Sequence, residues 1–142
     1  MQFWKRKKSK KGFTLLEVII VIIIVSVLAS LALPRFFKTV EYSRAMEALE
    51  NLSTVRQSMN RCYMTQGSSY TPCSVWLELD IEDPGSAPGS HFTYSFTGIP
   101  LTISTFRIQA TRNTVDSGIV SSFVTIDQLG VRGGGTAFQG IK

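Results

Sequence analysis

One acidic side chain lies in an apolar setting near the N-terminus. Glu17 is the only ionisable residue between Phe13 and Leu33, in the run FTLLEVIIVIIIVSVLASLAL. A carboxylate at the middle of a bilayer costs about 2.5–3.5 kcal/mol on insertion scales, and less near an interface. Thr14-x-x-Glu17 also fits a capping box at a helix start, but capping and the helix dipole together contribute only about 1 kcal/mol. We therefore expect Glu17 to have a functional role beyond capping.

The other candidate residues form no catalytic arrangement. His91 is the only histidine; without a second ligand or a nearby nucleophile, it is expected at the surface where a strand begins. An acidic cluster contains Glu78, Asp80, Glu82 and Asp83. Its spacing does not match an EF-hand loop, which favours a solvated loop over a calcium site. Gly133-Gly134-Gly135 lacks the Lys-Ser/Thr and the helix of a phosphate loop. We therefore expect no enzyme, no metal and no cofactor.

The element that must position Glu17 is an apolar helix behind a basic tip. A helix from Phe13 to Leu33 covers about 30 Å, the thickness of the hydrocarbon core of a membrane. The whole excess of 15 Lys and Arg over 10 Asp and Glu comes from six cations at the N-terminus, Lys5, Arg6, Lys7, Lys8, Lys10 and Lys11. These cations should stay cytoplasmic, with the rest of the chain beyond the membrane. Because that remainder is nearly neutral, the sequence does not favour nucleic-acid binding.

Two kinds of targeting signal fit the basic tip and the apolar run. One is a Sec-type secretory signal, cleaved after the small residues of Ser30-Leu31-Ala32. Such a signal gains nothing from a carboxylate at Glu17, so that residue argues against it. The other reading rests on a known family pattern.

The residues Lys10-Lys11-Gly12-Phe13-Thr14-Leu15-Leu16-Glu17-Val18 resemble the class III signal of type IV pilins and type II secretion pseudopilins. The resemblance covers about residues 5–40 directly. It implies cleavage between Gly12 and Phe13 by a prepilin peptidase and N-methylation of the new amine on Phe13. It also implies that Glu17 pairs with that amine on a neighbouring subunit, since a buried ion pair is tolerated only when both charges are present.

Pro34 also matches a position of the family pattern. A proline inside a helix removes one backbone donor and clashes with the preceding turn, so we expect a kink there. Many members of the family carry a glycine about two turns earlier, where this chain has Ser26 and Ser30. The chain departs from the family pattern at this place.

After Pro34 the pattern changes to an amphipathic helix. One stripe contains Ala45, Ala48, Leu52, Val55, Met59 and Cys62 at spacings of three and four, with Leu49 and Tyr63 beside it. This periodicity predicts that the helix continues to about Tyr63 and packs on a domain. Arg44, Glu47, Glu50, Arg56 and Arg61 fall mostly on its other face.

The second half of the chain has the pattern of a small sheet. Alternating residues predict strands near 92–96, 101–110 and 120–126, with turns at 98–100 and 116–118. Strands so close in sequence should form an antiparallel meander. The expected fold class is α+β, with a long helix packed on about three strands.

The expected organisation has four parts. Residues 1–12 are the leader, 13–34 the transmembrane and assembly half of the helix, and 35–63 its amphipathic half. Residues 64–142 form a periplasmic domain. Within that domain we expect a loop at 64–90, the meander at 91–127 and an irregular tail at 128–142.

Cys62 and Cys73 are the only cysteines. They lie in the segment expected to be exported, where disulfides persist, so we predict that they bond to each other. The bond would fix the helix end to the following loop. Two free structural thiols remain the alternative.

The resemblance therefore implies a type IV pilus subunit that acts by assembly. We expect insertion in the inner membrane with the N-terminus cytoplasmic, maturation by prepilin peptidase, and polymerisation with copies of itself on an inner-membrane assembly platform into an extracellular pilus. A type II secretion or competence pseudopilin is the first alternative. A periplasmic binding domain with a Sec-type signal is a more distant one.

Overall fold

The computed structural model describes residues 12–96, 104–114, 122–135 and 138. The basic tip and the turns expected at 98–100 and 116–118 lie outside them. The described chain divides into two units, residues 1–38 and 39–142. A single helix, α1 (Leu15–Thr65), contributes to both.

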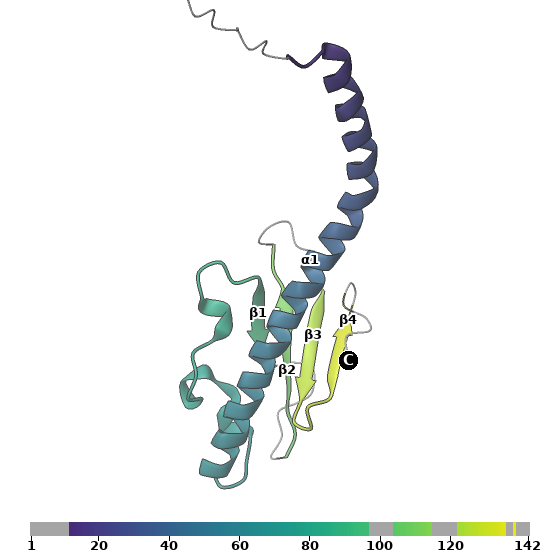
Figure 1. Cartoon of the computed structure of the whole chain (residues 1–142). Helices are drawn as coiled ribbons and strands as arrows, with labels where there is room; N and C mark the ends of the chain where they lie inside the picture. Colours follow the sequence, from purple (N-terminus) through teal and green to yellow (C-terminus); the bar gives the residue numbers. More distant parts are fainter. Residues whose placement is uncertain (1–11, 97–103, 115–121, 136–137, 139–142) are drawn as a thin grey trace, which may run out of the picture. The chain divides into compact units, whose positions relative to one another are not determined.

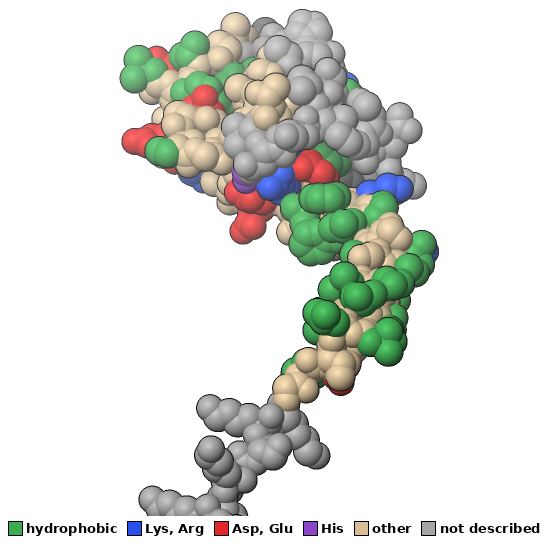
Figure 2. Space-filling model, turned by 90° about the horizontal axis from the view of Figure 1, so that it is seen from above, with side chains coloured by type: hydrophobic (Ala, Val, Ile, Leu, Met, Phe, Trp, Pro, Cys, Tyr) green, Lys and Arg blue, Asp and Glu red, His purple; other side chains and the backbone are tan. Residues whose placement is uncertain are grey.

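Apolar side chains surround the first half of α1 in the structure (Figure 2). The residues from Leu15 to Leu33 include no buried side chain. Ser26 and Ser30 donate their hydroxyls to the helix carbonyls of Ile22 and Val27, each at 2.7 Å. The two serine hydroxyls are thus satisfied inside the helix, which suits a surrounding without water. Among the described residues, α1 is the one helix long and apolar enough to cross a membrane.

The helix passes through Pro34 without interruption. Because proline has no N–H, the carbonyl of Ser30 loses its usual partner four residues later. The expected kink at Pro34 stays a prediction.

The second half of α1 lies across a four-stranded antiparallel sheet (Figure 1). Its buried residues are Ala45, Ala48, Leu49, Leu52, Val55, Ser58, Met59 and Cys62. The predicted stripe is therefore the face that covers the sheet. The helix ends in a turn where Gly67 and Ser68 adopt positive φ, and Ser68 N–H donates to the carbonyl of Tyr63.

The sheet has the order β1-β2-β3-β4, and each strand pairs antiparallel with the next. Its strands are β1 (Phe92–Ser95), β2 (Arg107–Arg112), β3 (Phe123–Asp127) and β4 (Arg132–Gly135). Three short 3-10 helices, η1 (Thr71–Ser74), η2 (Trp76–Glu78) and η3 (Pro84–Ser86), lie in the segment expected to be a loop. The α+β class and the antiparallel meander are confirmed.

The expectation of about three strands misses β4, which lies in the segment expected to be an irregular tail. Its three glycines are explained by close neighbours. A Cβ on Gly135 would lie 2.3 Å from the ring of Phe123, and one on Gly134 would lie 2.3 Å from the carbonyl oxygen of Phe138. A Cβ on Gly133 would lie 2.9 Å from Thr125 Oγ1. Glycine lets this edge strand lie close to the side chains of Thr125 and Phe123 and to the backbone of Phe138.

Candidate functional site

The first candidate site is the start of α1. Thr14 Oγ1 accepts the backbone N–H of Glu17 at 3.2 Å, which is one half of the predicted capping box. Thr14 O also accepts the N–H of Val18 at 3.3 Å. Thr14 therefore fixes the first helical turn and places Glu17 in it.

The residues around the expected cleavage point are open. Phe13 is 82% exposed and Glu17 is also exposed. A Cβ built on Gly12 would have no atom within 4 Å. Within the described residues, the Glu17 carboxylate makes no ion pair. The single chain thus shows a carboxylate and an apolar surface that another molecule would have to cover.

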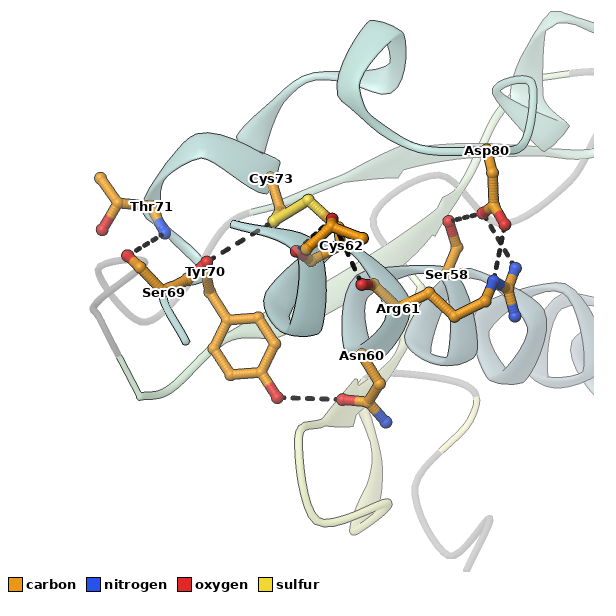
Figure 3. The surroundings of a disulfide bond; sticks show 10 residues. Ser58, Asn60, Arg61, Cys62, Ser69, Tyr70, Thr71, Cys73 and Asp80 are labelled. Atoms are coloured by element: carbon orange, nitrogen blue, oxygen red, sulfur yellow. Dashed lines mark hydrogen bonds and ion pairs between the residues drawn. A yellow bond between two sulfur atoms is a disulfide. The ribbon is translucent and has the colours of Figure 1, made fainter. Parts of the chain in front are cut away.

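The second feature is the disulfide that closes the end of α1 (Figure 3). Cys62 bonds to Cys73, the pairing expected from the sequence, and both residues belong to the core. Tyr70 lies between the two cysteines in sequence and packs on Tyr63 and Phe106, with ring centroids 4.4 and 4.7 Å away. Its hydroxyl donates to Asn60 Oδ1 at 2.9 Å. The loop after α1 is therefore held by the bond and by packed rings.

We predict that reducing this disulfide lowers the free energy of unfolding by about 2–3 kcal/mol, because the unfolded chain regains the entropy of a short closed loop. Urea unfolding of the full-length chain in detergent, with and without dithiothreitol, measures this difference. A variant with both Cys62→Ala and Cys73→Ala is the control, and dithiothreitol should leave its unfolding midpoint unchanged. Equal midpoints for oxidised and reduced wild type would contradict the expected stabilisation.

Part of the acidic cluster has structural contacts. Asp80 accepts two hydrogen bonds from Arg61, at 2.6 and 2.9 Å, and a further one from Ser58 (Figure 3). The hydrogen bonds from Arg61 and then Ser58 lower the pKa of Asp80 to about 2. Asp83 accepts the N–H of Gly85 at 2.8 Å and so begins η3. Glu78 and Glu82 are exposed. These contacts favour the solvated-loop reading over a calcium site.

A third feature, an ion pair between Glu41 on α1 and Arg112 at the end of β2, was missed from the sequence. Arg112 is 1% exposed and donates to both carboxylate oxygens of Glu41, at 3.0 and 3.1 Å. Arg44 adds a further contact to Glu41 at 2.9 Å. The hydrogen bond from Arg112 is the largest cause that lowers the pKa of Glu41. A bidentate pair of this kind fixes the helix on the sheet at a defined position.

Further acceptors complete the surroundings of Arg112. Its guanidinium donates to the carbonyl oxygen of His91 at 3.0 Å and to Asn113, and it lies 5.8 Å from the ring centroid of Phe92. His91 directly precedes β1, as expected, and its backbone carbonyl helps to hold Arg112. The alternation of Phe106, Ile108 and Ala110 points to Arg112 as the next inward residue. That alternation was the available signal.

Three comparisons with known proteins bear on these features. Residues 7–33 match the family described as the prokaryotic N-terminal methylation motif. The type IV major fimbrial protein FimA of Dichelobacter nodosus is 27% identical over 93 residues, which cover 65% of this chain and 59% of that protein. The type II secretion system core protein G is 29% identical over 83 residues in Aeromonas hydrophila, covering 58% of this chain and 57% of that protein. Core protein G of Escherichia coli K12 is 30% identical over 80 residues, covering 56% and 54%.

The matches extend over part of each relative. This chain spans 52% to 61% of the length of the curated relatives it matches. A crystal structure of the minor pilin PilV of Neisseria meningitidis aligns with 69% of this chain and 92% of PilV, at a TM-score of 0.49 and 17% identity.

The relatives are structural subunits of the pilin and pseudopilin kind and not enzymes. The methylation motif and the apolar helix that follows it together indicate anchoring in the inner membrane. The resemblance seen in the sequence is confirmed: the chain carries the prokaryotic N-terminal methylation motif and is similar to type IV fimbrial proteins and to the core protein of type II secretion systems.

Proposed function

We propose that this chain is the subunit of a type IV pilus. The chain is inserted in the inner membrane, matured by a prepilin peptidase, and polymerised on an inner-membrane platform into an extracellular filament of its copies. The observation that carries this proposal is the exposed apolar surface of α1 between Leu15 and Leu33, with Glu17 as its only charge. Such a surface needs lipid before assembly and other apolar helices after it.

A pseudopilin of a type II secretion system is the second candidate. The similarity to core protein G, at 29% and 30% identity, supports it about as well as FimA supports a pilus. Both candidates use the same N-terminal chemistry. They differ in where the filament lies, on the cell surface or within the cell envelope. Filaments in sheared surface fractions at natural expression would favour the pilus.

We predict that the mature chain begins with N-methylated Phe13. Blocking the cleavage by Gly12→Val should leave a precursor heavier by the leader, because a branched side chain obstructs access of the peptidase to the backbone. Open space around the position where a Cβ would stand on Gly12 means that the substitution leaves the fold intact. Intact mass and N-terminal sequencing of the membrane fraction measure the outcome.

Ser9→Val is the control, since it places the same branched side chain in the leader away from the expected cut and should leave maturation unchanged. A mature chain that begins at Leu33 would mean cleavage after Ala32 by a Sec-type peptidase. That result would refute the proposed maturation, and with it the assembly role of Glu17.

A further inference from the structure

One edge of the unit formed by residues 39–142 carries an open acidic hollow. The hollow lies between Trp76 and Ser86 and has a volume of about 530 Å³. Leu77, which is 91% exposed, and Ile81 give it apolar lining, while Glu82 and Asp83 give it negative charge. The one other charged residue that lines it is Asp80, whose charge is balanced by Arg61. An occupant of this hollow should therefore present small apolar groups next to a cation.

The turn between β3 and β4 presents such groups. Leu129 is 78% exposed and Val131 is 61% exposed, on either side of Gly130, and the exposed Arg132 follows them. We call residues 129–132 the aliphatic turn. No ion pair of Arg132 occurs among the residues that the structure describes, and its side chain is exposed.

The aliphatic turn is held in a defined shape. Asp127 Oδ1 accepts the backbone N–H of Leu129 at 3.0 Å and that of Val131 at 2.8 Å. Gly130 N–H donates to the carbonyl of Asp127 at 3.0 Å, and Gly130 has the positive φ of 84° that favours glycine. Arg56 supports the turn from α1 through the carbonyl of Gln128, at 3.4 Å. Because the turn is already ordered, docking it loses little conformational entropy.

The segment that lines the hollow lies beside β1, and the aliphatic turn leads into β4, so the two belong to opposite edges of the same sheet (Figure 1). The hollow includes Ser86 of η3, which contacts the edge strand β1, whereas the turn leads into the other edge strand, β4. The two surfaces therefore meet only between two copies. A contact between different surfaces of identical copies repeats along an assembly unless the rotation closes a ring.

We propose that the aliphatic turn of one copy docks in the acidic hollow of the next copy. Leu129 and Val131 cover Leu77 and Ile81, and Arg132 lies against Glu82. The contact is small, so it positions neighbouring globular units while the apolar helices supply most of the association energy. This contact rests on the proposed function, since it requires the chain to assemble with its copies.

Disulfide trapping tests the contact in the full-length chain. Two tagged copies are expressed together, one with Leu77→Cys and the other with Leu129→Cys, and mild oxidation should link the two tags. Both substitutions on one chain should give a ladder of linked oligomers. Replacing Leu129→Cys by Met64→Cys is the matched control, because Met64 is 79% exposed and belongs to neither surface. That pair should stay unlinked.

Charge exchange gives a second readout of the same contact. Arg132→Glu should lower the yield of the linked pair about fivefold, as expected for loss of one exposed ion pair. Adding Glu82→Arg should restore the yield, whereas Glu78→Arg should not, because Glu78 does not line the hollow. Equal restoration by Glu82→Arg and Glu78→Arg, or restoration by neither, would overturn the assigned pairing.

Filament yield in the same cells separates this contact from the proposed function. Filaments without the linked pair would overturn the contact and leave assembly through the helix intact. A linked pair without filaments would support the contact and contradict the proposed polymerisation into a filament. Self-linking of Leu77→Cys or of Leu129→Cys, at the yield of the mixed pair, would overturn the docking of one surface into the other.

Discussion

Replacing Glu17 by Ala should abolish most filament formation while leaving the subunit stable in the inner membrane. The substitution removes the only charge from an otherwise apolar segment, so the helix inserts at least as well as before. Filament assembly should be impaired, because the carboxylate is expected to pair with the amine of mature Phe13 on a neighbouring subunit. An unpaired charge buried in the filament costs several kcal/mol.

The contacts of Glu17 allow the charge to be separated from the helix cap. Glu17→Gln keeps the shape of the side chain and loses its charge, so it should fail like Glu17→Ala. Thr14→Ala is the matched control, because Thr14 Oγ1 accepts the N–H of Glu17 and its loss removes the cap alone. That variant should lose about 1 kcal/mol of helix stability and keep filament yield near normal.

The measurement is filament yield in sheared surface fractions, divided by total cellular subunit. For a secretion pseudopilin, the same ratio is measured after overexpression. Normal yield from both Glu17→Ala and Glu17→Gln would contradict the ion pair and leave only the capping role. Loss of filaments in Thr14→Ala as well would assign the defect to the helix start instead of the charge.

The helix could be predicted from the sequence because its signals are local. The apolar run sets its first half, and the spacing of Ala45, Leu52, Val55 and Met59 sets the face that is buried in the second. Both patterns repeat within a few residues and need no knowledge of distant partners. The predicted end at Tyr63 lies close to the observed end at Thr65 for the same reason.

The fourth strand could not be predicted because glycine carries no hydrophobic signal. Residues 133–135 read as an irregular segment, yet they form β4 because large neighbours leave no room for side chains. Phe123, on the paired strand β3, supplies that constraint at Gly135, and the backbone of Phe138 supplies it at Gly134. The requirement for glycine is visible only once the strands are paired.

The ion pair between Glu41 and Arg112 was missed for a related reason. Taken alone, each residue looks like a surface charge, and the two are separated by 71 positions. Charged side chains are almost never fully buried unless they are paired, so the inward position of Arg112 implies an acidic partner. The sequence offers several acids for that place, and only the fold selects Glu41.

Replacing Arg112 by Met should be among the most destabilising single substitutions in the globular unit. Methionine fills much of the same space but leaves the partly buried Glu41 with Arg44 alone. Breaking a buried ion pair on one side costs about 3–5 kcal/mol, and the exposure of Glu41 places the expected loss near the lower end. Arg107→Met is the matched control, because Arg107 lies on the opposite, less buried face of the same strand. That variant should change the free energy of unfolding by less than about 1 kcal/mol.

The same pair should make stability depend on acid in a defined direction. Arg112 lowers the pKa of Glu41 below its usual value of 4.5, so the folded state favours the ionised carboxylate. This contribution is fully present above the unfolded pKa and is lost as the pH falls through the folded one. Asp80, with a pKa of about 2, adds a second loss of stability on acidification.

Urea unfolding of the full-length chain in detergent measures this dependence at pH 7 and pH 3, followed by Trp76 fluorescence in a Trp4→Phe background. From pH 7 to pH 3, the free energy of unfolding should fall less for Arg112→Met than for wild type. An equal fall in both proteins would mean that the pair of Glu41 and Arg112 does not contribute to the pH dependence of stability. The pair of Asp80 and Arg61 would then account for it.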